Sequence, residues 1–121
     1  SYFYQSRGEC KSSLKDYRGA ILDYEKAISI NSNGFYKPRV YNSMAYSKMQ
    51  INDLKGALLF LNKAIEDEYS KYNNDETAYS YYLLGFVKNS LNDKEGACIA
   101  WSKSGELGNP EAYNAIQKNC K

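Results

Sequence analysis

The chain has 121 residues, of which 43% are hydrophobic and 25% are charged; these values are typical of one soluble globular domain. Sixteen basic and fourteen acidic residues give a formal net charge of +2, a balance that argues against binding to nucleic acid or to an anionic membrane. Histidine is absent, so the commonest general base and metal ligand is missing.

The predicted elements are all helices, and they come in pairs along the chain. The second segment has its apolar positions at helical spacing, namely Ala20, Ile21, Tyr24, Ala27 and Ile28. Pro38 suits the first turn of a helix that runs to about Gln50, and residues 73–76 provide start signals for a helix over Tyr79–Ser90. No stretch alternates with the period of a strand, so the predicted fold class is all-α.

A short motif recurs three times, at Leu14–Ala20, Ile51–Ala57 and Leu91–Ala97. Its final alanine returns after 37 residues and again after 40 residues, which is the period of a helical repeat. The third residue of each copy is an aspartate, and we expect it to cap the second helix of its pair: Asp16, Asp53 and Asp93. We expect the alanines to pack against small residues of the first helices, which are Gly8, Ala45 and Gly85.

The last segment of the chain predicts a seventh helix, over residues 109–120. Ala112, Ala115 and Ile116 would face the preceding helices, while Glu111 would face water. Repeat arrays need such a helix to cover the apolar surface of their last unit. We therefore expect it to act as a capping helix.

The repeat resembles the tetratricopeptide repeat, whose unit carries the pattern W-x2-L-G-x2-Y followed by A-x3-F. Each unit here has an aromatic and a small residue in its first helix, then alanine and a large apolar residue in its second: Tyr4, Gly8, Ala20 and Tyr24; Tyr41, Ala45, Ala57 and Leu61; Tyr81, Gly85, Ala97 and Trp101. The resemblance implies a right-handed α-solenoid of three helical hairpins plus the capping helix, forming one domain over residues 1–121. The implied repeats are residues 1–34, 38–71 and 78–108. Arg7 departs from the pattern, because an apolar residue is usual there.

The resemblance also implies that the first helices line a concave groove that binds a protein or peptide. The matching groove positions are Gln5, Glu9, Arg39, Asn42, Tyr46, Tyr79, Tyr82, Phe86 and Asn89. Family members that hold the acidic tails of chaperones use Lys, Arg and Asn side chains as a carboxylate clamp. The corresponding clamp positions are Gln5, Glu9, Ser43, Tyr79 and Leu83. They include no cation, so such tails are not the expected partner.

Two interpretations of the aromatic end of this groove stay open. Its residues are Tyr79, Tyr82, Leu83 and Phe86. In the first interpretation they form a surface for a peptide with apolar anchors. In the second they pack beneath the capping helix, where Tyr113 also needs a partner.

The three cysteines do not predict a metal site, because they lack close spacing and histidine partners. Free, partly buried thiols are the simpler interpretation of Cys10, Cys98 and Cys120. The alternative is a disulfide between Cys98 and Cys120, since Cys98 lies on the helix that the capping segment would cover. Such a bond would indicate an oxidising compartment, secreted or periplasmic.

No segment predicts membrane insertion or a leader. The longest apolar run, Ala57–Leu61, is far shorter than the ~18 residues of a membrane span. The chain begins at Ser1 without a methionine, so we interpret it as a processed or trimmed piece. We expect a soluble protein and favour the cytoplasm, although a removed leader would leave another compartment open.

Nothing in the sequence predicts catalysis. It has no phosphate-binding loop, no nucleophile elbow and no histidine, and it indicates no cofactor or metal. We therefore interpret the chain as a non-catalytic scaffold that binds a protein or peptide in its groove. The alternative is a structural or self-associating segment of a longer protein with the same repeats.

Overall fold

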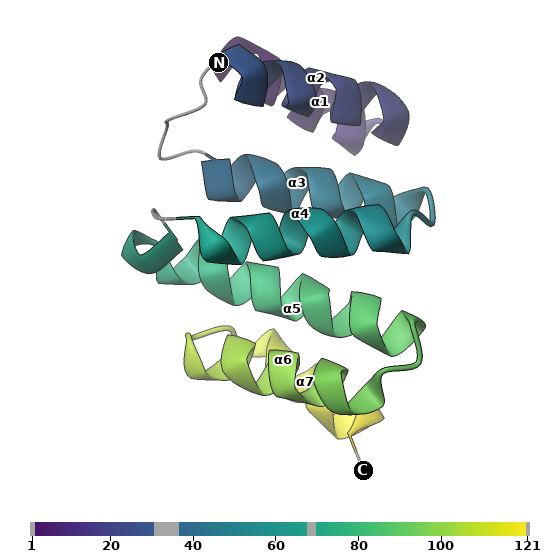
Figure 1. Ribbon diagram of the computed structural model, residues 1–121, viewed down its shortest axis with the longest axis vertical. Coiled ribbons are helices and arrows are strands. Elements are labelled where there is room, and N and C mark those ends of the chain that lie inside the picture. The colour runs from purple at the N-terminus through teal and green to yellow at the C-terminus, as the bar shows by residue number, and fades with distance from the viewer. Residues whose placement is uncertain (1, 31–36, 68–69, 121) are drawn as a thin grey trace.

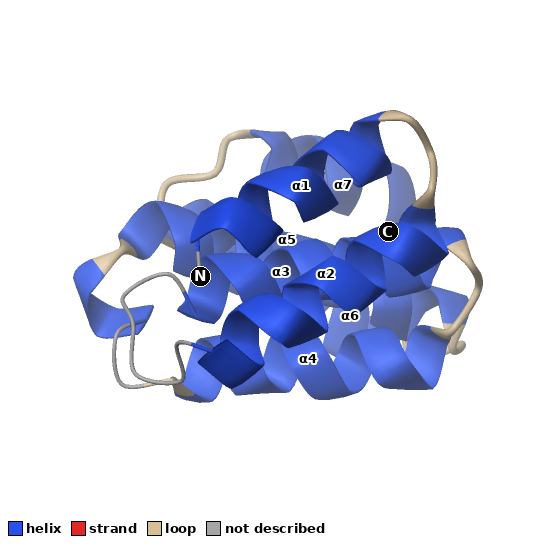
Figure 2. Ribbon diagram, turned by 90° about the horizontal axis from the view of Figure 1, so that it is seen from above, coloured by secondary structure: helices blue, strands red, loops and turns tan. Residues whose placement is uncertain are grey.

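The computed structural model describes residues 2–30, 37–67 and 70–120, and within them the chain forms helices and no strand (Figure 2). In chain order the elements are α1 (Tyr2–Ser13), α2 (Tyr17–Ile30), α3 (Lys37–Gln50), α4 (Leu54–Glu66), the short 3₁₀ helix η1 (Ser70–Tyr72), α5 (Asn74–Ser90), α6 (Lys94–Glu106) and α7 (Glu111–Asn119). The expected limits of the first repeat, residues 1 and 34, lie outside the described residues, as does residue 121.

The helices stack along the long axis of the molecule, with the N-terminus at one end and the C-terminus at the other (Figure 1). α1 packs on α2, α3 on α4 and α5 on α6, and successive pairs meet through α2 with α3 and through α4 with α5. α7 packs on α6 at the end of the stack. The all-α solenoid with a terminal helix, which the repeat predicted, is confirmed.

Each hairpin turn is closed by the aspartate that the motif predicted as a cap. The backbone N–H of the glycine three residues further on donates to Oδ1 of Asp16, Asp53 and Asp93, at 3.1, 3.0 and 2.9 Å. A side chain on that glycine would strike the capping carboxylate, which explains the motif's glycine. The residue before each aspartate has a positive φ, of 65°, 63° and 68° at Lys15, Asn52 and Asn92.

The second helix of each pair inserts one large apolar side chain between the helices. These side chains, at most 1% exposed, belong to Tyr24, Leu61 and Trp101. Gly8 leaves room for the first, since a Cβ there would lie 2.7 Å from Cε1 of Tyr24, and a Cβ on Gly85 would overlap the indole of Trp101. The small residues of the first helices thus accommodate aromatic rings, and not only the alanines that we expected beside them.

α3 and α5 begin with the signals that the sequence provided. Pro38 lies in the first turn of α3. The N–H of Glu76 donates to Oδ1 of Asn73 at 3.1 Å, which caps α5. α5 begins at Asn74, ahead of residue 78, where we expected the third repeat to start. The extra turn positions Asp75 and Glu76 at the edge of the stack.

A partly buried ion pair explains why Arg7 departs from the repeat pattern. Nε and Nη2 of Arg7 donate to the two carboxylate oxygens of Asp23 at 2.9 and 2.8 Å, and Nζ of Lys11 lies 3.1 Å from the same carboxylate. The Asp23 side chain is only 6% exposed, and the hydrogen bonds from Arg7 hold its pKa below the usual value. Arg7 therefore serves as the partner of a buried charge.

Candidate peptide-binding groove

A hollow of about 230 Å³, which we call the central hollow, opens between α1, α3 and α5. Its lining residues are Glu9, Ser12, Ser13, Tyr24, Ser43, Tyr46 and Tyr79. All of them except Tyr24 come from the first helix of a pair, which is where the resemblance places a concave groove. Three of the predicted groove residues, Glu9, Tyr46 and Tyr79, line this one hollow together.

The charges at the central hollow neutralise one another, and burial favours the neutral form of two of its tyrosines. Nη2 of Arg39 lies 2.9 Å from Oε2 of Glu9, and both side chains are partly exposed. Burial raises the pKa of Tyr24 to about 12, and the nearby Glu9 adds to this effect. Burial also raises the pKa of Tyr79 to about 12. Both hydroxyls therefore stay neutral at physiological pH and can donate hydrogen bonds.

Two of the predicted groove residues are buried, and one of them ties two helices together. Gln5 is 4% exposed and Asn42 is 1% exposed. Nδ2 of Asn42 donates to the backbone oxygen of Glu76 at 3.0 Å and to its Oε1 at 3.1 Å, while Oγ of Ser80 donates to Oδ1 of Asn42 at 2.6 Å. Asn42 thus ties α3 to α5. We leave Gln5 and Asn42 out of the proposed binding surface.

The aromatic end of the groove divides between packing and surface. The ring of Phe86 meets the rings of Tyr82 and Trp101 edge to face, with centroids 4.9 and 5.1 Å away, and it packs on the core cluster that α6 and α7 share. Leu83 is buried. Asn89 is half-buried and lines neither hollow described here. For Leu83 and Phe86 the structure therefore favours the packing interpretation.

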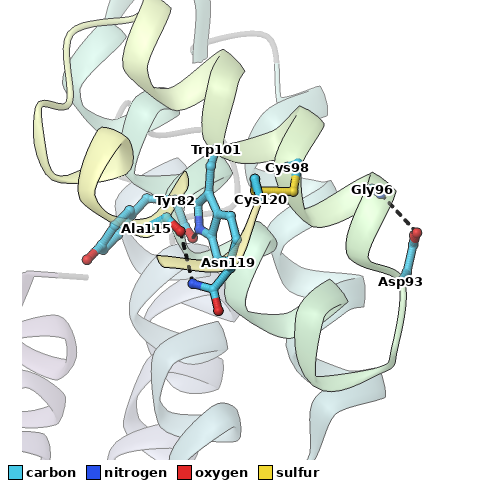
Figure 3. The surroundings of a disulfide bond; sticks show 8 residues. All are labelled: Tyr82, Asp93, Gly96, Cys98, Trp101, Ala115, Asn119 and Cys120. Carbon is cyan, nitrogen blue, oxygen red and sulfur yellow. Dashed lines mark hydrogen bonds between the residues drawn. A yellow bond between two sulfur atoms is a disulfide. The ribbon is translucent and has the colours of Figure 1, made fainter. Parts of the chain in front are cut away.

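Tyr82 has both roles, because it packs on the core and also reaches the surface. Its backbone oxygen accepts a hydrogen bond from Nε1 of Trp101 at 3.1 Å, and its ring points away from that contact (Figure 3). Tyr82 and Tyr79 line a second hollow of about 340 Å³, which we call the terminal hollow. Its lining residues are Asp75, Ala78, Tyr79, Tyr82, Gly108, Asn109, Pro110 and Glu111. Tyr79 lines both hollows, so the two adjoin.

Two carboxylates of the terminal hollow were missed as site residues by the sequence reasoning. Asp75 had only the role of a helix start signal, and Glu111 was expected simply to face water. Each lies in the first turn of its helix, α5 or α7. The available signal was that the expected capping helix returns over the third pair, which brings these two helix starts to the same edge.

A disulfide fastens α7 to α6 (Figure 3). It joins Cys98, within α6, to Cys120, the residue that follows α7, and their Cα atoms are 5.9 Å apart. Beside it, Nδ2 of Asn119 donates to the backbone oxygen of Ala115 at 2.9 Å. Cys10 is an exposed free thiol. Of the two interpretations of the cysteines, the structure has the disulfide for Cys98 and Cys120 and the free thiol for Cys10.

The described residues form neither a metal site nor a membrane span. Across residues 2–30, 37–67 and 70–120, no three His, Cys, Asp or Glu side chains gather in a way that could hold a metal ion. None of the helices described there combines the length and the apolar character of a membrane span.

Comparison with known proteins agrees with the stacked helical hairpins. The N-terminal domain of stress-induced protein-1 (STI-1) from C. elegans is similar over 99% of this chain and 94% of that chain, with a TM-score of 0.83 and 20% identical residues. No curated protein sequence matches the chain. The fold is that of a helical-repeat domain of this kind. Residues 1–33, the first of the three helical hairpins, match the family model described as Tetratricopeptide repeat.

Proposed function

We propose that the chain is a protein-interaction scaffold that binds an extended peptide segment of a partner protein in the central hollow. Tetratricopeptide-repeat domains are in general scaffolds of this kind, and helical solenoids use their concave surfaces for binding. The observation that carries the proposal is that Tyr46 and Tyr79, from two different hairpins, line the same hollow.

The chemistry of the central hollow suits a peptide with apolar or aromatic side chains. Tyr46 is 36% exposed, and a tyrosine ring offers a large contact area together with a polar hydroxyl. The Ser12 hydroxyl, which can donate and accept, faces the same hollow. Because Arg39 neutralises Glu9, this part of the groove attracts neither a strongly acidic nor a strongly basic segment by charge alone.

The test is a selection from a random-peptide display library against the folded chain, followed by affinity measurements. We expect the selected peptides to lose about tenfold in affinity for Tyr46→Ala, because an aromatic anchor at the centre of an interface carries much of the binding energy. The matched control is Leu59→Ala, which truncates a 54% exposed side chain of α4 that does not line the central hollow. Equal losses in the two variants, or no loss in Tyr46→Ala, would show that the peptides bind elsewhere.

Self-association is the second candidate function, and the start of α1 favours it. Tyr2 and Phe3 are 72% and 62% exposed, although the guanidinium of Arg7 lies 5.4 Å from the ring centre of Phe3. Adjacent exposed aromatic side chains are common in contacts between chains. Sedimentation velocity over a wide concentration range separates the candidates. A monomer at every concentration eliminates self-association, and a dimer that Phe3→Ser abolishes supports it.

A further inference from the structure

The terminal hollow differs from the central hollow in its charge. Its walls are the start of α5, the turn between α6 and α7, and the first turn of α7. Asp75 and Glu111 stand on two of these walls and are both exposed. Among the described residues, neither carboxylate takes part in any of the ion pairs found, whereas Glu9 in the central hollow is paired with Arg39. The described lining of the terminal hollow therefore carries two negative charges and no positive one.

The aromatic walls of the terminal hollow attract a cation by a second mechanism. Tyr79 and Tyr82 are only half-buried and both line the hollow. A guanidinium or ammonium group near the face of an aromatic ring is stabilised by the ring's quadrupole. Burial raises the pKa of Tyr82, and the nearby negative charge of Glu111, which lines the same hollow, adds to this effect. The ring and the carboxylate are thus held next to each other.

The helix starts at this hollow do not make it an anion site. A helix N-terminus can bind an anion through its free N–H groups. Here the N–H of Glu76 donates to Asn73 and the N–H of Glu111 donates to Oδ1 of Asn109 at 3.1 Å. Side-chain oxygens of the chain itself therefore occupy these donors. Lys71 lines an adjoining hollow with Asp75 and has a partner of its own, so its ammonium weakens the attraction of Asp75 for a cation but does not line the hollow that holds Glu111.

We propose that the terminal hollow holds a basic side chain, arginine or lysine, of the peptide that lies in the groove. This inference rests on the proposed function, because Tyr79 is shared by the two hollows and the same peptide would cross both. The apolar stem of the basic side chain lies along the rings of Tyr79 and Tyr82. Its charged head lies between Asp75 and Glu111, where charge-assisted hydrogen bonds are available. The partner segment is therefore aromatic or apolar at the central hollow and basic at the terminal hollow.

The test uses two probe peptides that differ in one charge. The first is acetyl-Gly-Leu-Arg-Leu-Gly-amide, and in the second the arginine is replaced by citrulline, which has the same shape without the charge. Each is titrated into the ¹⁵N-labelled full chain. We expect the arginine peptide to shift the amide signals of Tyr82, Gly108 and Glu111, and to bind about fivefold more tightly than the citrulline peptide at low salt, because two partly exposed ion pairs contribute modestly. The difference should shrink as salt is added.

The protein variants remove the charges and keep the shape of the hollow. In Asp75→Asn/Glu111→Gln we expect the preference for the arginine peptide to fall from about fivefold to about twofold or less, because only the aromatic rings still attract the charge. The matched control is Glu95→Gln/Glu106→Gln, which neutralises two exposed carboxylates of α6 that do not line the terminal hollow. The control should retain the full preference for arginine. An equal loss of preference in both double variants would mean that only net charge matters, and it would overturn the proposal.

The outcomes separate this inference from the proposed function. If the two probe peptides bind equally in the terminal hollow, or if neither shifts its signals, the basic-side-chain proposal is wrong. Peptides selected from the display library that still depend on Tyr46 would then leave the proposed function intact. If the selected peptides do not depend on Tyr46, the proposed function itself fails. Both proposals are supported if the selected peptides depend on Tyr46 and also carry a basic residue whose binding needs Asp75 and Glu111.

Discussion

Reduction of the Cys98–Cys120 disulfide should loosen the C-terminal end of the solenoid before the rest. The bond closes a loop with a sequence separation of 22 residues. The chain-entropy model gives ~3.4 kcal/mol of stabilisation for a loop of that length. α7 has 9 residues, and Ala112 and Ala115 are its buried residues in the cluster with Trp101. So small a helix can detach while the rest of the solenoid stays folded. We therefore expect reduction to lower the global unfolding free energy by only ~1–3 kcal/mol.

The assay combines denaturation with amide hydrogen exchange, and it uses the Cys10→Ser variant to prevent disulfide exchange. We expect addition of a reductant to lower the denaturation midpoint and to speed exchange in α7 more than in α3. The single tryptophan, Trp101, is fully buried in the cluster that contains Ala112 and Ala115, so its fluorescence should shift to longer wavelength. A variant that also carries Cys98→Ser and Cys120→Ser should not respond to the reductant. Identical α7 exchange with and without reductant would refute the reasoning.

Three further predictions concern residues that the structure explains individually. Gly85→Ala should lower the unfolding free energy by ~1–3 kcal/mol despite alanine's better helix propensity, because its Cβ would overlap the Trp101 indole; unchanged stability in denaturation would contradict the close contact. Lys15→Asn should stabilise by ~0.5–1 kcal/mol, since asparagine tolerates the positive φ found there; a loss of stability would count against that conformation. Asp23→Asn should make the unfolding free energy less dependent on pH in acid. The Arg7 hydrogen bonds lower the pKa of Asp23, so the native protein loses the stabilisation from this ion pair as pH falls below about 4. The variant lacks the ion pair and should not show this loss. An equal dependence of the unfolding free energy on pH in the two proteins would contradict the Arg7–Asp23 pairing.

The repeat made most of the fold predictable, because it rests on local rules. Three copies of one motif placed the helix starts, and the capping aspartates Asp16, Asp53 and Asp93 act within three residues of their partners. Pro38 and the seventh helix followed from equally local signals. η1 was not predicted, because it belongs to the segment between the second and third hairpins, where the motif gives no register. The start signals at residues 73–76 did mark the beginning of α5, although the third repeat was expected only from residue 78.

The candidate site was less predictable because burial depends on distant residues. Register along α3 places Asn42 on the groove side, but only the packed structure shows that Glu76 and Ser80 of α5 cover it. The pairing of Arg7 with Asp23 similarly joins two helices. Tyr46 and Tyr79 do meet at one hollow as the resemblance implied. Their role in binding remains a proposal.

The most direct test of the central claim is to map a selected peptide on the ¹⁵N-labelled chain by chemical shift. If the concave groove is the binding surface, the largest shifts fall on the first helices of the three hairpins, around Ser12, Tyr46 and Tyr79. The opposite result is shifts centred on Leu59 and Ile99, exposed apolar side chains of the second helices. That result would contradict groove binding and place the interaction surface on α4 and α6.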